Sequence, residues 1–221
     1  MCRYKKIDLE NWCRKEHYLY YTNSLNVEVN MTANIDVSEL LTFCHTNGYK
    51  FYPTLIYCVT KVLNRIENFK MFKDKNGDLC VWDSLVPNYT IFHEEDHTFS
   101  DCWTDFTDDF GSFYKNITSD MELGKTKRGI KVKSGQPANF YCVSCTPWTA
   151  FTAVSSRMVN GGAAFFPIIT AGKYDDNYQM PVNITIAHAV ADGYHIGLFF
   201  EYLQKEIDSE LEKQQAKLIQ D

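Results

Sequence analysis

The residues best suited to chemistry lie near the C-terminus, where a strand-like run meets polar residues. Residues 184–186 are all β-branched, which is typical of a buried strand. His188 follows this run, and Asp192 and the turn-former Gly193 come shortly after it. A histidine at the end of a buried strand can act as a general base, because packing fixes its ring while the turn leaves it accessible. The residue types alone also fit a core histidine beside a structural aspartate, so both interpretations stay open.

Two other spacings could indicate a metal or a redox site. Residues 93–97 read His-Glu-Glu-Asp-His, but a His-x-x-x-His pair brings its two rings close enough for one metal only on a helix. The surrounding pattern predicts an extended chain, so we expect no metal. Cys142 and Cys145 form a Cys-x-x-Cys pair, and redox pairs of this type sit at a helix N-terminus, which lowers a thiol pKa. Here they lie in a strand-like run ended by Pro147, which predicts two ordinary thiols.

Length and composition restrict the class of protein. The 221 residues, of which 45% are hydrophobic and 15% aromatic, predict a single domain over 1–221 with an ample core. A net charge of −6 disfavours nucleic acid as a partner, and no apolar run reaches membrane-spanning length. The first residues carry no apolar signal segment, so we expect a cytoplasmic protein with its eight cysteines reduced. The sequence has no Gly-x-Ser-x-Gly or Gly-x-x-x-x-Gly-Lys motif, which disfavours an α/β-hydrolase and a P-loop protein.

Helical and strand-like patterns alternate along the whole chain. Helices are predicted at residues 12–21, 38–44, 51–66, 105–123 and 196–211. Strands are predicted at 25–35, 89–92, 98–103, 140–145, 151–155, 165–171 and 180–186, with a hairpin at 72–82 around Asn76-Gly77. Because the two kinds of element are intermixed, we predict an α/β fold, a two-layer sandwich with a mixed β-sheet flanked by helices. The polar residues 213–221 predict a frayed tail.

Residues 188–195 resemble a signature of the chloramphenicol acetyltransferase family, His-(Ala/Ser)-x-x-Asp-Gly-(Phe/Tyr)-His. Other stretches resemble the same family in the same order along nearly the whole chain. They are Trp-x-Arg-Lys-Glu-His-Tyr at 12–18, Tyr-Lys-Phe-Tyr-Pro at 49–53, Ser-x-x-Pro-Trp at 144–148 and Thr-Ala-Gly-Lys-Tyr at 170–174. Several weak motifs in one order are more specific than any one of them. The resemblance implies the fold of that family and direct acetyl transfer from acetyl-CoA to a hydroxyl group.

The resemblance also implies a role for individual residues. His188 matches the catalytic base, Ser144 the hydroxyl that steadies the tetrahedral oxyanion, and Thr170 a residue that holds transition-state solvent. Asp192 matches an aspartate that pairs with the arginine at Arg14. The positions matched to coenzyme A binding are Lys50, Tyr52, Trp148 and Lys173. Members of the family form homotrimers, with the histidine from one chain and the serine from its neighbour.

The acceptor pocket and one histidine depart from the family pattern. The positions matched to the acceptor are Tyr21, Val29, Asp101 and Ser156, of which the last three replace phenylalanine, a small apolar residue and leucine. The family usually has a histidine pair, and Ala187 replaces its first member. Neighbouring side chains on a strand point to opposite faces, so the base at His188 is retained.

Three functions are consistent with these features. The first is O-acetylation of a small hydroxylated molecule, with chloramphenicol the best named acceptor. The second is an acyltransferase for another acceptor or a longer acyl group. The third is a non-catalytic relative that binds a ligand without turnover, which the retained Arg14, Ser144, Thr170, His188 and Asp192 argue against.

Overall fold

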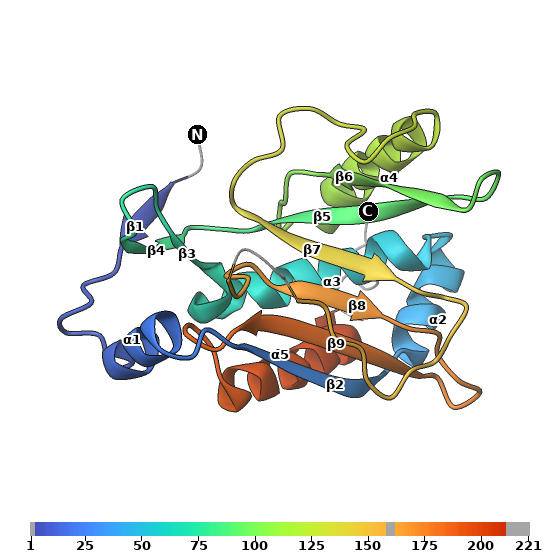
Figure 1. Ribbon diagram of the computed structural model, residues 1–221. Coiled ribbons are helices and arrows are strands. Elements are labelled where there is room, and N and C mark those ends of the chain that lie inside the picture. The colour runs from blue at the N-terminus through green and yellow to red at the C-terminus, as the bar shows by residue number, and fades with distance from the viewer. Residues whose placement is uncertain (1–2, 158–161, 211–221) are drawn as a thin grey trace.

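The computed structural model describes residues 3–157 and 162–210, and its elements follow the predicted alternation (Figure 1). The helices are α1 (Lys15–Asn23), α2 (Ser38–Asn47), α3 (Phe51–Arg65), α4 (Phe110–Lys125) and α5 (Gly193–Lys205), with short helices at Glu67–Lys70 and Glu206–Glu210. The strands are β1 (Tyr4–Lys6), β2 (Glu28–Asp36), β3 (Met71–Lys73), β4 (Leu79–Trp82), β5 (Val86–His93), β6 (Thr98–Trp103), β7 (Phe140–Cys145), β8 (Ile168–Ala171) and β9 (Gln179–Ala187). None of the described helices is both long and apolar enough to cross a membrane.

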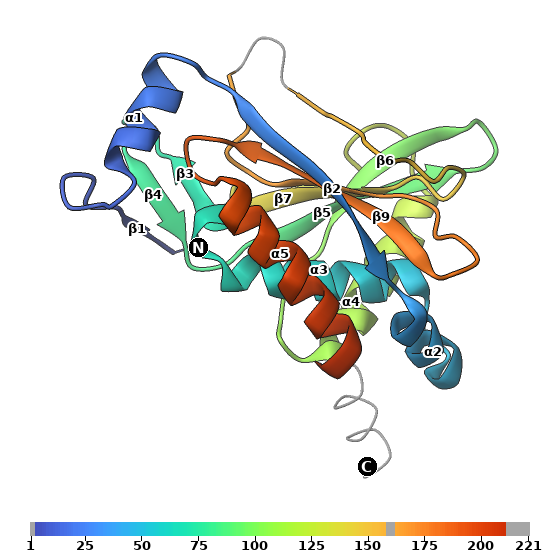
Figure 2. The ribbon, with the colours of Figure 1, turned by 90° about the horizontal axis from the view of Figure 1, so that it is seen from below.

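Six strands form the main sheet in the order β2-β9-β8-β7-β5-β6. The pairs of β7 with β5 and β8 are parallel, and the other pairs are antiparallel, so the sheet is mixed. Helices α3, α4 and α5 lie on one face of this sheet (Figure 2). The predicted two-layer α/β fold with a mixed sheet is therefore confirmed.

The side chains of β9 explain why only one face of the sheet is covered by helices. Ile184 and Ile186 are fully buried in the hydrophobic core, whereas the alternate residues Asn183 and Thr185 are buried but polar. The polar pair bonds to β2, where the Asn30 amide donates to Thr185 Oγ1 at 2.8 Å and the Asn183 amide donates to Thr32 Oγ1 at 3.0 Å. These bonds offset the cost of burying polar groups. We call the side of the sheet that carries these polar residues the polar face.

A second sheet of three strands, β1-β4-β3, lies beside α1 at one end of the molecule (Figure 1). Its β3–β4 hairpin is the one predicted from Asn76-Gly77, and Gly77 has a φ of 84°, which glycine adopts without a steric penalty. Strand β1 is not apparent in the sequence, because its three residues are exposed and carry no alternating pattern.

Most predicted bounds differ from the structure by a few residues, and two predicted elements differ by more. Residues 151–155 form no strand, because Phe151 turns toward Gly172 and Pro181 instead of pairing with another backbone. The helix predicted from residue 105 begins only at Phe110, since Asp109 caps it by accepting a hydrogen bond from the Ser112 backbone at 2.7 Å. The predicted tail at 213–221 lies outside the described residues.

Cys142 and Cys145 give the first testable prediction, because the strand holds them apart. The cysteines in the described part of the chain are all unpaired. Three residues of β-strand separate two Cα atoms by roughly 10 Å, and their side chains point to opposite faces. A disulfide requires Cα atoms within about 7 Å of each other. Burial also raises the pKa of both thiols to about 11, which keeps them protonated at neutral pH.

We therefore expect mild oxidants to leave Cys142 and Cys145 as thiols, and reductant to leave activity unchanged. Peptide mass spectrometry after treatment with oxidised glutathione would measure this, with the exposed Cys13 as the internal control that does react. An intrachain bond between Cys142 and Cys145 in the folded protein would contradict the structure.

Candidate active site

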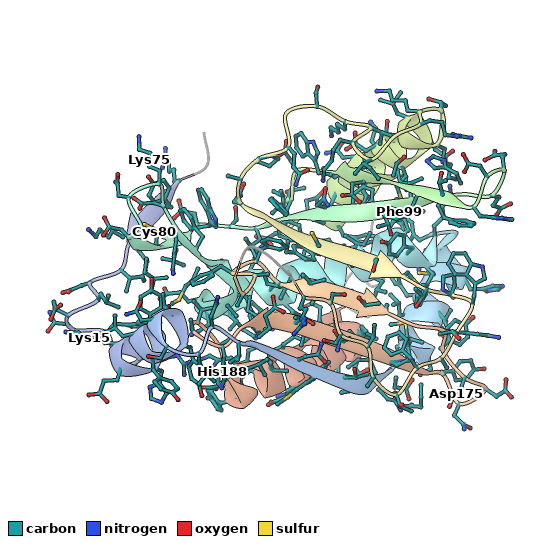
Figure 3. All side chains as sticks on the ribbon, in the orientation of Figure 1. Lys15, Lys75, Cys80, Phe99, Asp175 and His188 are labelled. Carbon is teal, nitrogen blue, oxygen red and sulfur yellow. The ribbon has the colours of Figure 1, made fainter. Side chains whose placement is uncertain are left out.

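His188 lies where β9 ends, beside α1 (Figure 3). Its backbone N–H donates to the Val27 carbonyl at 2.9 Å, which ties the end of β9 to the segment before β2. Its ring is half-buried and stacks on Tyr21, with ring centroids 3.9 Å apart and planes 22° from parallel. The structure thus brings together the predicted base and one predicted acceptor residue.

The hydrogen bond of the His188 ring fixes its tautomer. Nδ1 lies 3.0 Å from the Ala191 carbonyl oxygen. A carbonyl oxygen can only accept, so Nδ1 carries the hydrogen and donates it. In the neutral imidazole the lone pair is then on Nε2, the nitrogen available to act as a base. The Ala191 carbonyl was not identified from the sequence, because a backbone group leaves no residue signature.

Asp192 connects the turn after His188 to α1 and α5. It caps α5, accepting from the Tyr194 backbone at 3.1 Å and from His195 Nδ1 at 2.9 Å. It also forms an ion pair with Arg14, as the family resemblance implies. Burial opposes ionisation of Asp192, but the hydrogen bonds from Arg14 and His195 outweigh it and hold its pKa at about 2. The carboxylate therefore stays charged and positions the turn that carries His188.

Ser144 and Thr170 lie in the other half of the site, on the polar face. Ser144 of β7 is in register with Thr170 of β8, which is in register with Asn183 of β9. The three side chains therefore form a row across the sheet. The Tyr52 hydroxyl donates to the Val143 carbonyl at 3.1 Å, which anchors α3 beside Ser144.

The residues matched to coenzyme A gather near this row. Lys50 and Tyr52 line a pocket of about 220 Å³ that also includes Phe92. Trp148 is largely exposed and packs edge-on against Phe92, with ring centroids 4.7 Å apart. Lys50 Nζ donates to Glu122 at 2.9 Å, and this bond raises the pKa of the lysine. Lys173 is exposed nearby, with its backbone N–H bonded to the Thr149 carbonyl at 2.8 Å.

The four predicted acceptor residues are divided between the two halves. Tyr21 lies with His188, whereas Asp101 of β6 lies on the polar face near Ser144. Val29 of β2 packs against the core, and Ser156 is an exposed loop residue. The pockets lined by Lys50, by Asn30 and by Phe151 contain none of the four.

The two halves are too far apart to serve one substrate within one chain. Strands β7 and β9 end at opposite sides of the sheet (Figure 1). His188 is five residues beyond Asn183, the residue in register with Thr170 and so with Ser144. Five residues of strand span roughly 16 Å, whereas a base and an oxyanion donor that act in one reaction must each lie about 3 Å from the reacting groups. A site that uses both residues therefore requires two chains.

The two histidines considered for a metal have other partners. His93 is buried, and its Nε2 lies 2.8 Å from Ser100 Oγ, while the His97 ring stacks on Phe92. Among the residues that the structure describes, no three His, Cys, Asp or Glu side chains are grouped as metal ligands.

Comparison with known proteins identifies the family. A family model described as chloramphenicol acetyltransferase matches residues 2–204. The chain belongs to the chloramphenicol acetyltransferase family. It is 39% identical over 206 residues to a chloramphenicol acetyltransferase of Clostridium perfringens, covering 92% of this chain and 94% of that protein. It is 38% identical to the one of Campylobacter coli, covering 91% and 97% of the two chains. The predicted resemblance is thus confirmed.

Solved structures support the same fold. A chloramphenicol acetyltransferase structure matches with a TM-score of 0.78 at 22% identity, covering 94% of this chain and 99% of the other. A dihydrolipoamide acetyltransferase of Azotobacter vinelandii matches with a TM-score of 0.65 at 15% identity, covering 87% and 86%. At these low identities, the two solved structures support the fold of this chain and nothing further.

Ala187 gives a prediction about the missing first histidine. Its side chain is fully buried in the core, while the neighbouring His188 ring is half-exposed. An Ala187→His substitution overpacks the core and buries ring nitrogens without partners, each effect costing about 1–3 kcal/mol. We expect the thermal midpoint to fall on the order of 10 °C while kcat changes little. The measurement is a thermal melt beside steady-state kinetics.

The matched control for this substitution is Ala138→His. Because Ala138 is exposed, it should accept the imidazole ring with no change in the thermal midpoint. An Ala187→His protein with a raised kcat and an unchanged midpoint would show instead that position 187 tunes the base.

Asp192 gives a prediction about pH. Its folded-state pKa lies below the ordinary value of 3.8, so its stabilising contribution is complete above about pH 4. That contribution is lost as pH falls toward about 2, where the folded carboxylate takes up a proton. We expect the stability difference between the natural protein and Asp192→Asn to shrink from pH 5 to pH 2, as measured by urea unfolding. When both proteins also carry Arg14→Met, this stability difference should change less between pH 5 and pH 2. An unchanged pH dependence of the difference would exclude the ion pair as its cause.

Proposed function

We propose that this chain transfers the acetyl group of acetyl-CoA to a hydroxyl of chloramphenicol. The observation that carries the proposal is the match over nearly the whole chain to relatives named chloramphenicol acetyltransferase, combined with a His188 ring whose Nδ1 is held by a carbonyl. Such an enzyme confers resistance to the antibiotic by modifying it.

His188 is the proposed general base. A hydroxyl group of high pKa is a poor nucleophile toward a thioester at neutral pH. His188 Nε2 takes the hydroxyl proton while the acceptor oxygen forms its bond to the acetyl carbon. The tetrahedral intermediate then collapses by breaking the carbon–sulfur bond, and the imidazolium returns the proton to the coenzyme A thiolate. Protons and charges balance, and no covalent acyl-enzyme is needed.

Ser144 is the proposed donor to the oxyanion. Negative charge develops on the acetyl carbonyl oxygen in the transition state, and a hydroxyl held by a rigid strand stabilises it without reorganisation. One such donor contributes roughly 3–4 kcal/mol to transition-state stabilisation. Thr170, in register with Ser144 and only 7% exposed, is proposed to hold a solvent molecule in the same transition state.

The proposed assembly is a homotrimer with the active site between subunits. The separation of Ser144 from His188 within one chain supports this assembly, because two neighbouring chains can supply one residue each. A cyclic arrangement in which each chain contributes different surfaces to its two neighbours closes into a ring. Each interface would then contain one His188 and one Ser144 from different subunits.

Acetyl-CoA is the proposed co-substrate, held by the residues around the pocket beside Lys50. The exposed amines of Lys50 and Lys173 are proposed to attract its phosphates, and Lys50 would exchange Glu122 for them. Tyr52 and the exposed Trp148 offer aromatic surface to the rest of the molecule. Since acetyl-CoA is a cytoplasmic metabolite, the reaction is proposed to occur in the cytoplasm.

Two single variants and their mixture test this proposal. His188→Ala should abolish acetyl transfer, and Ser144→Ala should lower kcat by roughly 10- to 1000-fold with little change in KM. If each interface takes one residue from each chain, co-expression of the two variants should restore about one quarter of the natural activity, because that fraction of interfaces carries both residues. The assay is release of free thiol from acetyl-CoA with and without chloramphenicol.

Two results would contradict the proposal. Thiol release by the natural protein that does not depend on chloramphenicol would remove chloramphenicol as the acceptor. Mixed oligomers with no more activity than the separate variants would place both residues in one chain. The separately purified variants, mixed without exchange of subunits, are the control.

A further inference from the structure

Asp101 stands out among the residues of the polar face because it is a carboxylate only two strands away from Ser144, the proposed oxyanion donor. It lies in the middle of β6, directly opposite Thr90 of β5. The residues that flank Thr90 in β5 are buried in the core, so Thr90 and Asp101 face the other way, toward the polar face.

One oxygen of Asp101 is anchored and the other is free. Oδ2 accepts from Lys131 Nζ at 2.8 Å and from the Asn88 amide at 3.4 Å. Because Asn88 is almost fully buried, its contact fixes the position of the Asp101 carboxylate on the polar face. Oδ1 has no hydrogen-bond partner among the residues at 3–157 and 162–210, and it is accessible to solvent. The carboxylate therefore keeps a fixed orientation with one acceptor site open.

The stability of the protein does not account for this carboxylate. Its ion-pair partner Lys131 is 51% exposed, and pairs of this kind contribute little to folding. The negative charge has a local effect on the polar face, since it adds to burial in raising the pKa of the nearby Cys142 thiol. A charge at this position is more consistent with recognition of a ligand than with packing.

Asp101 lies within the length of one small molecule from Ser144. Strands β5 and β7 pair as far as Tyr89 and Val143, so Thr90 and Ser144 are the next residue of each strand, and Asp101 is one strand beyond Thr90. Two strand spacings amount to roughly 10 Å. A molecule that places its reacting hydroxyl beside Ser144 and is about that long therefore brings its far end to Asp101.

We infer that Asp101 is a specificity-determining residue whose free oxygen selects acceptors with a hydrogen-bond donor at the end remote from the reacting hydroxyl. This inference rests on the proposed function, because it places the acceptor beside Ser144. A nitro group or a dichloroacetyl group at that end offers no donor to a carboxylate, whereas an amine, hydroxyl or amide N–H does. A site built to bond a donor discriminates strongly against an analogue that lacks it.

Chloramphenicol and two analogues test the inference. One analogue has an amine in place of the nitro group, and the other is the free amine left when the dichloroacetyl group is removed. We expect at least one of the two to exceed chloramphenicol in kcat/KM by roughly tenfold in the natural protein. Asp101→Ala should remove this preference, and Asp101→Asn, which keeps an acceptor oxygen without the charge, should retain part of it. Asp105→Ala, which removes an exposed carboxylate just after β6, is the matched control and should keep the full preference.

Calorimetric titration of the three compounds separates this inference from the proposed function. If the natural protein acetylates none of them, the proposed function fails, but tighter binding of an amine analogue that Asp101→Ala abolishes would still support the role of Asp101. Equal affinity for all three compounds, or a preference that persists in Asp101→Ala, would overturn the inference. An equal fall in kcat/KM for every compound in Asp101→Ala would mean that Asp101 is only structural.

Discussion

The structure depends on the pairing of β9 with β2 on one side and β8 on the other. This strand has a neighbour on each side, and its alternating side chains send Ile184 and Ile186 into the helical layer and Asn183 and Thr185 to the polar face. A slip of one residue would bury polar groups among the helices, so the register is strongly specified. The same register places His188 at the end of the strand and aligns Asn183 with Thr170.

The consequence of this register is that the proposed catalytic residues are divided between two ends of one sheet. The end beside α1 has the proposed base, His188, whose ring is held by the Ala191 carbonyl and whose turn is held by the Arg14–Asp192 ion pair. The other end has hydroxyls on rigid neighbouring strands. Each half is held in place by its own hydrogen bonds, so the proposed assembly would only have to bring the halves of two chains together. This division supports the proposed assembly of more than one chain around each active site.

Much of the fold could be predicted because local patterns agreed with the tertiary structure. The long amphipathic helix α3 and the Asn76-Gly77 hairpin are specified by periodicity and turn chemistry, which act over a few residues. The sequence predictions were wrong where the local residue pattern favours one structure and contacts with distant parts of the chain impose another. Residues 151–155 have a strand-like composition, but Phe151 packs beside Gly172 and has no strand to pair with. The exposed β1 forms only because β4 offers it an edge.

The sequence by itself determined the family and the residues that could do the chemistry, because side-chain type and motif order are written in it. It could not determine which of those residues share a space, since that depends on strand register between segments far apart in the chain. The tertiary structure decided that Tyr21 stacks on His188, that Ala191 fixes the imidazole tautomer, and that Asp101 is oriented by Asn88 and Lys131. These contacts join residues or backbone groups with no common motif, so only folding brings them into hydrogen-bond or van der Waals range.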